Sequence, residues 1–546
     1  MSRFFRRTGP KLALLAAVVL MAVAGCVPTD GLDDLFRTVV SPRTWFVATT
    51  GDDHNDCLAL ETPCRTIGLA IERATAGDMI FVEPGTYQEF NTHGDGAFVI
   101  DKNINLLGDG PDADAVRLDG GGERPVLVIA GRAHPIVENL TIQNGGGGDG
   151  RGVLVQENAG LTMYRTVVRD NTGAGVFFTG GAGATLWLDE AEVTRNGDGG
   201  LRLGPSSTTI EGSRIIANTG PGIVTGGGFL TIRGTTIDGN QFDSNGEGLW
   251  VGEGSNVRVD SSTFSGHDHV AIFNDGVLRL ENSTVSGNRV GIRNERDLSL
   301  VHSTVAYNLA LSLDDRYATR VSIRNSIVLK AGATDCLPGS GTEIILEGDN
   351  LACWSTADGD LLLGPLADNG GPTQTLALLE GSPAIDAAGA DCGVATDQRG
   401  EDRPQIVACD IGAFELRADE LGAEPLSLPI EPTTPTGNPG LTTLEELNCR
   451  KGPGTAYEVV TRLPVGMDVP IDGRNGDSTW WYIRIPTSGQ RCWVWGNLVR
   501  TRGNTMDLPI GEATALGCWV QDNPQYPKHC VVPCPANASP GGTCTP

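Results

Sequence analysis

The sequence predicts an all-β chain built mainly as one long parallel β-helix, and two repeating patterns lead to this prediction. In the first, a polar residue, nearly always Asn, ends a short apolar run every 20 to 27 residues. The series is Asn144, Asn171, Asn196, Asn218, Asn240, His267, Asn288 and Asn308, with His267 in the one place that lacks Asn. In the second, three-residue runs such as Leu201-Arg202-Leu203 alternate apolar and polar residues, as strands do. A period of this size is typical of a solenoid whose repeats bury their apolar faces against each other.

Each repeat, or coil, is too short to hold a helix beside two or three strands, and it lacks the Leu-x-x-Leu-x-Leu pattern of leucine-rich repeats. Each strand is therefore expected to pair with the same strand of the next coil, roughly 4.8 Å away. An Asn at a repeated bend can satisfy local backbone groups or adopt the left-handed conformation, and stacked Asn side chains can form a hydrogen-bonded ladder. We assign these residues a structural role and no ligand.

The first 26 residues have the pattern of a secretory leader. A basic stretch from Arg3 to Lys11 precedes the apolar run from Leu12 to Ala24. The following Val23-Ala24-Gly25-Cys26 resembles the bacterial lipobox, which implies that Cys26 carries acyl chains that hold the protein on a membrane without spanning it. We expect residues 27–43 to form a tether and the protein to be extracytoplasmic and lipid-anchored, on either the inner or the outer membrane.

The β-helix is expected to span residues 44–416. Trp45-Phe46-Val47 predicts its first strand, and Met79 to Val82 predicts a second. Between them, Thr66 to Ala76 is apolar at helical spacing, which predicts a short helix. Such a helix would cover the open end of the solenoid, where the first coil has unpaired strand edges.

Both ends of this region resemble known families. WFVATTGDDHNDC, with the residues up to Tyr87, resembles the opening of right-handed β-helix proteins of the pectin-lyase-like superfamily. Residues 364–416 resemble the choice-of-anchor Q module, through GSPAID (381–386), DQRG (397–400) and CDIGAFE (409–415). The resemblance implies a right-handed β-helix displayed at a cell surface. It implies no defined reaction, because the superfamily contains lyases, hydrolases, epimerases and non-catalytic proteins.

A second module is expected to follow a proline-rich linker. The linker, residues 417–443, is predicted to be extended and semi-rigid because of its repeated Pro. Residues 444–500, with NCRKGPGTAY and WWYI, are similar to the bacterial SH3-like domain, a small β-barrel whose relatives often bind cell-wall peptides. Its aromatic residues are expected to divide between the core and a stacking surface; they are Trp480, Trp481, Tyr482, Trp493 and Trp495. Residues 501–546 are expected to form a cysteine-rich tail.

The cysteine count agrees with an exported protein. Thirteen Cys are present, and lipidation of Cys26 leaves an even twelve for disulfides. Sequence proximity predicts Cys57–Cys64, Cys336–Cys353, Cys392–Cys409 and Cys449–Cys492. The tail holds Cys518, Cys530, Cys534 and Cys544, for which three pairings are open. The spacings do not match metal-binding patterns, so no metal site is assigned to the cysteines.

The formal net charge of −27 argues against nucleic acid as a partner. The favoured interpretation of this acidity is the solubility of an exported protein, and the alternative is the collection of cations. Two acidic loops are candidates for calcium, although neither has the spacing of a known calcium loop. They contain Asp52, Asp53 and Asp56, and Asp109, Asp112 and Asp114. Solvated acidic turns are the favoured interpretation.

Candidate catalytic residues are few. Asp314 and Asp315 are adjacent, so in a strand they would point to opposite faces and could not act as a pair. His267 and His269 could share a face as a base or a weak metal site, although a polar turn is the favoured interpretation. We therefore predict a non-catalytic cell-envelope protein that binds glycan or cell-wall peptide and needs no cofactor. The alternative is a polysaccharide lyase or hydrolase acting on the β-helix face.

Overall fold

The computed structural model divides into two units, residues 1–423 and 424–546. In the first, it describes residues 42–420 apart from 90–95, 182, 242–245, 316, 332–341, 355–359 and 390–391. In the second, it describes residues 440–443, 447–452, 459–474, 480–486, 490–495, 499–502, 511–513, 519–523 and 526–531. Cys26, Cys336 and Arg316 lie outside the described residues.

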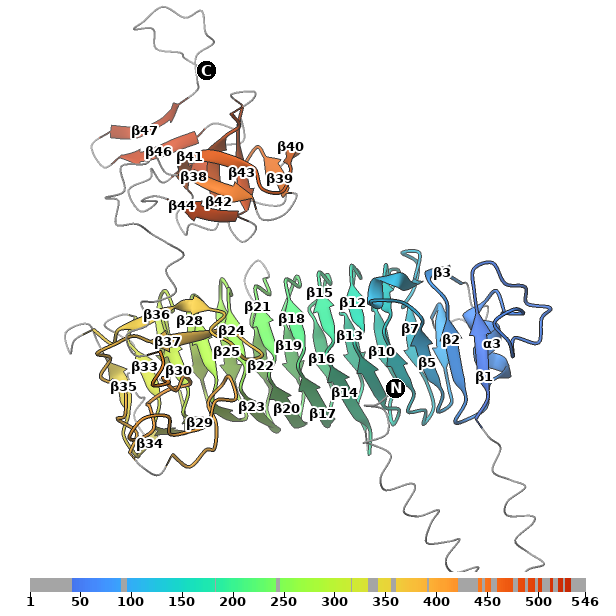
Figure 1. Cartoon of the computed structure of the whole chain (residues 1–546), viewed down its shortest axis with the longest axis horizontal. Coiled ribbons are helices and arrows are strands. Elements are labelled where there is room, and N and C mark those ends of the chain that lie inside the picture. The colour runs from blue at the N-terminus through green and yellow to red at the C-terminus, as the bar shows by residue number, and fades with distance from the viewer. Residues whose placement is uncertain are drawn as a thin grey trace, which may run out of the picture. The chain divides into compact units, whose positions relative to one another are not determined.

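The first unit is a parallel β-helix, as the sequence predicts, and its coils pass through three sheets in turn (Figure 1). Sheet A contains β1 (Thr44–Val47), β2 (Met79–Val82), β5 (Asn105–Gly108), β8 (Ile136–Glu138), β11 (Leu161–Tyr164), β14 (Thr185–Asp189), β17 (Ser206–Glu211), β20 (Gly228–Arg233), β23 (Ser255–Asp260), β26 (Val277–Glu281), β29 (Asp297–Val301), β32 (Arg320–Arg324) and β34 (Glu343–Glu347). Each strand pairs in parallel with the strand one coil away, so the alternating apolar residues stack into one core.

The other two sheets repeat this arrangement. Sheet B contains β3 (Gly85–Gln88), β6 (Val116–Asp119), β9 (Thr141–Gln143), β12 (Val167–Arg169), β15 (Glu192–Thr194), β18 (Arg214–Ile216), β21 (Thr236–Asp238), β24 (Thr263–Ser265), β27 (Thr284–Ser286), β30 (Thr304–Ala306), β33 (Ile327–Leu329) and β35 (Leu351–Trp354). Sheet C contains β4 (Phe98–Ile100), β7 (Leu127–Ile129), β10 (Val153–Val155), β13 (Val176–Phe178), β16 (Leu201–Leu203), β19 (Ile223–Thr225), β22 (Leu249–Val251), β25 (Val270–Asn274), β28 (Val290–Asn294) and β31 (Leu311–Asp314).

A helix covers the N-terminal end of the solenoid. Helix α3 (Ile67–Arg73) is shorter than the predicted span and buries Ile67, Ala70 and Ile71 against the first coil. The Glu89 carboxylate accepts hydrogen bonds from the backbone N–H groups of Ile67 and Gly68, at 2.6 and 2.8 Å. These bonds satisfy two donors that every helix leaves unpaired at its start. A short 3₁₀ helix, η3 (Ala113–Ala115), precedes β6.

The predicted Asn ladder exists at the corner between sheets B and C. Asn196 Nδ2 donates to Asn218 Oδ1 at 2.9 Å, and Asn218 Nδ2 donates to Asn240 Oδ1 at 2.9 Å. The same bond continues from coil to coil along the series Asn171, Asn196, Asn218, Asn240, His267, Asn288 and Asn308. All of these side chains are buried. His267 therefore replaces an Asn in the ladder, as its place in the sequence predicts.

Asn144 does not belong to the ladder, contrary to the prediction. Strand register aligns Asn144 with Asp170, so the ladder position in that coil falls on Gly145. Gly145 has no side chain to continue the stack, and its backbone N–H donates to Asn171 Oδ1 at 2.7 Å. Asn144 is exposed and takes the left-handed conformation with φ of 58°, as Asp170 does with 55°. The left-handed tolerance of Asn thus explains Asn144 and not the ladder residues.

A second ladder lies at the corner between sheets A and B, and the sequence analysis missed it. Backbone N–H groups donate to a Ser or Thr hydroxyl of the next coil at 3.1 to 3.4 Å. The acceptors are Ser213, Thr235, Ser262, Ser283, Ser303 and Ser326, and all are buried. Both polar corners are therefore satisfied by side chains from neighbouring coils, as buried backbone groups require.

After the last coil, the chain turns back and packs against sheet B. We call residues 360–389 and 392–420 the end module; it contains the hairpin β36 (Leu363–Ala367) and β37 (Thr375–Leu378). It covers a column of outward-facing Thr residues, Thr263, Thr284 and Thr304. Gln398 Nε2 donates to Thr263 Oγ1 at 2.9 Å, and Thr284 Oγ1 donates to Gln398 Oε1 at 2.6 Å.

The second unit contains a seven-stranded antiparallel barrel in the order β40-β39-β43-β42-β41-β38-β44. Its strands are β38 (Gly440–Thr443), β39 (Leu447–Arg450), β40 (Val459–Leu463), β41 (Asp468–Arg474), β42 (Trp480–Arg484), β43 (Arg491–Trp495) and β44 (Val499–Arg502). The barrel thus begins a few residues before the predicted boundary and ends just beyond it. The tail adds β45 (Gly511–Ala513), β46 (Trp519–Asn523) and β47 (Tyr526–Val531).

Three predicted disulfides are present, Cys57–Cys64, Cys392–Cys409 and Cys449–Cys492. Cys353 is also disulfide-bonded. The side chains of the tail cysteines, Cys518, Cys530, Cys534 and Cys544, lie outside the described structure. In the described part of the chain, none of the helices is long and apolar enough to cross a membrane.

Candidate functional site

A shallow groove follows the corner between sheets C and A in the second half of the solenoid. Two adjoining hollows of about 550 and about 410 Å³ form it, and they share Asp275 and Arg296. We call this surface the C–A groove and define it by Phe229, Glu253, Asp275, Val277, Arg293, Glu295, Arg296, Asp297 and Tyr317. Each of these residues lies in or beside the connection that leads from sheet C back to sheet A.

Two aromatic rings lie at the ends of the groove. Phe229 is 66% exposed and Tyr317 is 64% exposed. Phe229 belongs to β20 and Tyr317 precedes β32, so four coils, about 19 Å at the usual strand spacing, separate them along the solenoid. Rings exposed to this degree next to a hollow are typical of a binding surface rather than of a packed core.

The floor between the rings is charged. Arg296 Nε donates to Asp275 Oδ1 at 2.9 Å, and Arg296 Nη2 lies 3.3 Å from Glu253 Oε1. The hydrogen bond to Asp275 and the negative charge of that carboxylate raise the pKa of Arg296. Arg293 binds Glu295 at 2.9 Å, and Thr319 Oγ1 donates to Asp297 Oδ1 at 2.8 Å. The groove thus offers fixed hydrogen-bond donors and acceptors between two stacking surfaces.

An aromatic strip on sheet C continues from the groove. Trp250 is 38% exposed and packs edge-on against Phe273, with 5.2 Å between ring centroids. The Arg293 guanidinium lies 5.6 Å from the Phe273 centroid, so one arginine contacts both the strip and the groove. None of these groove and strip residues was predicted from the sequence; they are Phe229, Trp250, Phe273, Arg296 and Tyr317.

The two candidate histidines do not form a catalytic pair. His267 is buried in the Asn ladder, its Nδ1 lies 2.9 Å from Asn288 Oδ1, and burial lowers its pKa. His269 lies outside the ladder, with its Nδ1 3.6 Å from Glu247 Oε1. Burial raises the pKa of Glu247. His267 is therefore structural, and only His269 remains accessible.

Asp314 and Asp315 point to opposite faces, as the sequence analysis expects. Register aligns Asp314 with Arg293 and Phe273, which face outward. Asp315 takes the position that Asn274 and Asn294 hold in the two preceding coils. The side chains of these two Asn residues stack in the interior, where Asn274 Nδ2 donates to Asn294 Oδ1 at 2.6 Å. Asp314 is displaced from His269 by four residues along the strand direction, about 13 Å, and by two coils along the solenoid axis, about 10 Å. These residues are too far apart to act on one bond.

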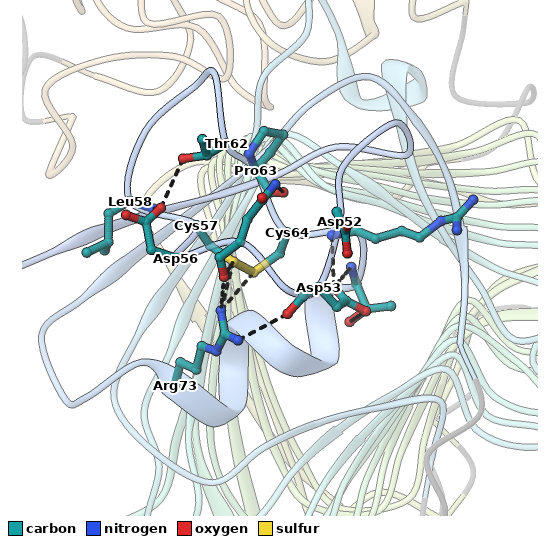
Figure 2. The surroundings of a disulfide bond; sticks show 12 residues. Asp52, Asp53, Asp56, Cys57, Leu58, Thr62, Pro63, Cys64 and Arg73 are labelled. Atoms are coloured by element: carbon teal, nitrogen blue, oxygen red, sulfur yellow. Dashed lines mark hydrogen bonds between the residues drawn. A yellow bond between two sulfur atoms is a disulfide. The ribbon is translucent and has the colours of Figure 1, made fainter.

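The acidic loops use their carboxylates to hold backbone in place, and Figure 2 shows the first of them, around Asp52, Asp53 and Asp56. Asp53 accepts bonds from the N–H groups of Arg65 and Thr66, at 2.9 Å each. Asp56 accepts from Leu58 N and Thr62 Oγ1 beside the Cys57–Cys64 disulfide. Asp52 contacts His54, Asp112 caps η3, and Asp114 accepts from Thr141. Among the described residues, no three metal-ligating side chains come together.

Most aromatic residues of the barrel belong to its buried part. Trp480, Trp481 and Trp493 are 9%, 8% and 1% exposed. Tyr482 is half-buried and packs against Trp493, with 5.1 Å between the ring centroids. The Trp495 side chain lies outside the described structure. Of the five predicted stacking residues, Tyr482 is therefore the one that the described surface offers to a ligand.

The end module contains a buried charge network. Arg403 Nη1 lies 2.6 Å from Glu415 Oε2, and Arg399 Nε lies 2.9 Å from Asp397 Oδ2. Asp410 accepts hydrogen bonds from the backbone N–H groups of Asp386 and Leu416. The Asp397, Arg399, Arg403 and Glu415 side chains are nearly inaccessible to solvent. The DQRG and CDIGAFE motifs therefore serve to hold the module together.

Comparison of the wild type with Asp410→Asn is expected to show a pH-dependent stability difference. Burial and the nearby Glu415 carboxylate raise the pKa of Asp410 to about 7. A carboxyl with a raised pKa stabilises the fold below its unfolded pKa, and this contribution is lost as the pH rises through 7. The free energy of unfolding of the wild type should fall between pH 4 and pH 7 relative to the variant, by up to about 1.4 kcal/mol per pH unit. Denaturant titrations of both proteins across this range check it, and parallel profiles would contradict it.

His302 acts in the opposite direction and serves as the control. Burial, together with the Arg403 charge, lowers its pKa to about 3, and its Nε2 lies 2.7 Å from the Cys392 carbonyl oxygen. Its contribution to stability is present above the unfolded pKa of roughly 6.5 and is lost as the pH falls from there toward 3. His302→Gln should therefore remove the fall in unfolding free energy that the wild type shows as the pH decreases below about 6.5. Asp410→Asn should instead remove the fall that the wild type shows as the pH rises toward 7.

Comparison with known proteins supports both folds. Residues 125–241 and 226–351 match the family model of the right-handed β-helix region, and residues 445–500 match that of the bacterial SH3 domain. The solved structure of XylC in complex with xylose is similar at 12% identity, covering 68% of this chain and 98% of that chain, with a TM-score of 0.50. Pectate lyase Pel9A is 15% identical, covering 70% of this chain and 98% of its own, with a TM-score of 0.46. No curated protein sequence matches this chain.

The chain thus carries a right-handed parallel β-helix followed by a bacterial SH3 domain. At 12% identity, the similarity to XylC shows the fold alone.

Proposed function

We propose that this protein is an envelope protein that binds a polysaccharide along the C–A groove without cleaving it. The observation that carries this proposal is the pair of exposed rings, Phe229 and Tyr317, at the ends of one charged hollow. Sugar rings present apolar faces that stack on aromatic side chains and hydroxyls that bond to fixed polar groups. The separation of about 19 Å between the rings suits an extended polymer lying along the solenoid axis.

The charge of the groove favours a neutral glycan. Four carboxylates and two guanidinium groups line it, so it carries an excess of negative charge; they are Glu253, Asp275, Glu295, Asp297, Arg293 and Arg296. The whole chain is also strongly acidic, at −27. Both features repel a polymer of uronic acids at low ionic strength.

Location completes the proposal. The leader and its lipobox-like end at Cys26 support export and lipid anchoring, on residues outside the described structure. The end module, whose motifs resemble choice-of-anchor Q, supports display at the cell surface. The bacterial SH3 domain supports a second attachment, to cell-wall peptide. The protein would then hold a glycan with one unit and the wall with the other.

Replacing either groove ring is expected to weaken glycan binding. Phe229→Ala and Tyr317→Ala should each raise the Kd for a neutral polysaccharide such as xylan at least about tenfold, because each removes a stacking surface. Calorimetry or affinity electrophoresis measures the change. Trp187→Ala is the matched control, since Trp187 is an exposed sheet A aromatic outside the groove. Equal affinities for wild type, ring variants and control would remove the groove from the proposal.

The alternative function is a polysaccharide lyase or hydrolase that uses the same groove. The observation that favours it is Arg296 held between Glu253 and Asp275, since carboxylates near a bound sugar can act as acid or base. Incubation of the purified protein with xylan and, separately, with uronic-acid polymers and calcium, followed by assay for reducing ends and unsaturated ends, decides between them. Product formation that Asp275→Asn abolishes would establish the enzyme.

A further inference from the structure

The barrel carries a cationic spot in an otherwise acidic chain. Residues 440–502 contain eight Arg and Lys against six Asp and Glu, whereas the whole chain has a net charge of −27. The module therefore has a small excess of positive charge within an acidic protein, which favours an anionic partner for it.

Two arginines lie directly opposite each other on one face of the barrel. Arg484 of β42 pairs in register with Arg491 of β43, and the next pair on the same face is Tyr482 with Trp493. Like charges at directly opposed positions repel, so this arrangement requires an anion between them. Asp472 of β41 supplies one: it accepts from Arg484 Nε and Nη2 at 3.1 and 2.6 Å, and from Arg491 Nε at 2.7 Å.

One carboxylate balances only one of the two charges. Two guanidinium groups carry ten N–H donors, of which the Asp472 carboxylate takes three. Arg484 and Arg491 are 47% and 36% exposed, so a ligand can reach them from solvent. The half-buried Tyr482 ring lies beside them on the same face.

We propose that this face, Asp472, Arg484 and Arg491 with Tyr482, binds the free carboxylate of a short peptide. A guanidinium matches a carboxylate through two parallel hydrogen bonds, and the neighbouring ring stacks on the preceding peptide group. Asp472 orients the two arginines and competes with the ligand for them. The inference rests on the proposed attachment of the SH3 domain to cell-wall peptide, and it names the group that is recognised.

The test uses the full-length protein and two probes, N-acetyl-D-alanyl-D-alanine and its C-terminal amide, with purified peptidoglycan as a third. The wild type should bind the free acid at least about tenfold more tightly than the amide, because the amide loses a charge-assisted pair. Arg491→Gln should abolish this preference. Asp472→Asn should strengthen binding of the free acid, an effect that a misfolded domain cannot produce. Arg462→Gln removes the same charge from an exposed position on β40. It should change neither the affinity for the free acid nor the preference for the acid over the amide.

The outcomes separate the two proposals. Equal binding of acid and amide by the wild type, with peptidoglycan still bound, would overturn the carboxylate site and leave the cell-wall attachment standing. Failure to bind peptidoglycan at all would overturn both. Displacement from peptidoglycan by poly(glycerol phosphate), with no preference for the free acid, would assign the face to a phosphate polymer and overturn the peptide.

Discussion

Arg403→Gln is expected to destabilise the end module by about 3–5 kcal/mol, the usual effect of removing one partner of a buried ion pair. Arg403 Nη1 bonds to Glu415 Oε2 at 2.6 Å and to the Asp410 carbonyl oxygen at 3.0 Å, and Nη2 bonds to the Gly412 carbonyl oxygen at 2.7 Å. Without the guanidinium, the Glu415 carboxylate stays buried with no opposite charge beside it. Hydrogen exchange measured on peptides across residues 397–415 reports the local free energy of opening.

Two further variants make this expectation specific. Arg417→Gln removes an arginine of the same module whose side chain is 36% exposed, so it should cost less than about 1 kcal/mol. Adding Glu415→Gln to Arg403→Gln should recover part of the loss, because the uncompensated charge is then gone. Exchange rates that are the same in Arg403→Gln and the wild type would show that the network does not hold the module.

Asn218→Ala is expected to cost several kcal/mol of unfolding free energy, because it interrupts the Asn ladder in the middle. Asn218 Oδ1 accepts from Asn196 N and Nδ2, and its Nδ2 donates to Asn240 Oδ1 and to the Val193 carbonyl oxygen. Each buried group left without a partner costs about 1–3 kcal/mol. The midpoint of guanidinium unfolding, followed by far-ultraviolet circular dichroism, measures the effect.

Asn256→Ala provides the comparison for this variant. Asn256 lies on β23 with its side chain exposed, so the same chemical change there should alter the midpoint little. If Asn218→Ala and Asn256→Ala unfold at the same denaturant concentration, the buried ladder adds no more to the unfolding free energy than an exposed Asn does.

The period of the sequence was enough to predict the solenoid and most of the ladder. The prediction was wrong for Asn144, because the sequence does not distinguish two strand registers that differ by one residue. Pairing with the next coil shows that Gly145, and not Asn144, holds the ladder position. The Ser and Thr ladder could have been found, since Ser262, Ser283 and Ser303 repeat at the same spacing as the Asn residues. Because hydroxyl residues are common in turns, this pattern is less distinctive in the sequence than the repeated Asn.

The C–A groove was beyond prediction from the sequence. Phe229, Arg296 and Tyr317 belong to different coils and share no motif, so only the stacking of the coils brings them to one surface. Conversely, Asp314, Asp315 and His267 attracted attention as polar residues near strands, and the register shows that two of the three occupy interior stacks. A polar residue in a repeating corner is more often a structural partner than a catalyst.

The return of the end module along sheet B changes how the rod opens. A bare solenoid frays from its last coil inward, since each coil is held only by its neighbour. Here Gln398 reaches Thr263 across 135 residues of sequence and Thr284 across 114, and Ala413 reaches Thr304 across 109. These bonds tie three coils to the end module. The final coils can therefore separate only when the end module detaches as a whole, which turns a zipper-like loss of structure into a single cooperative step.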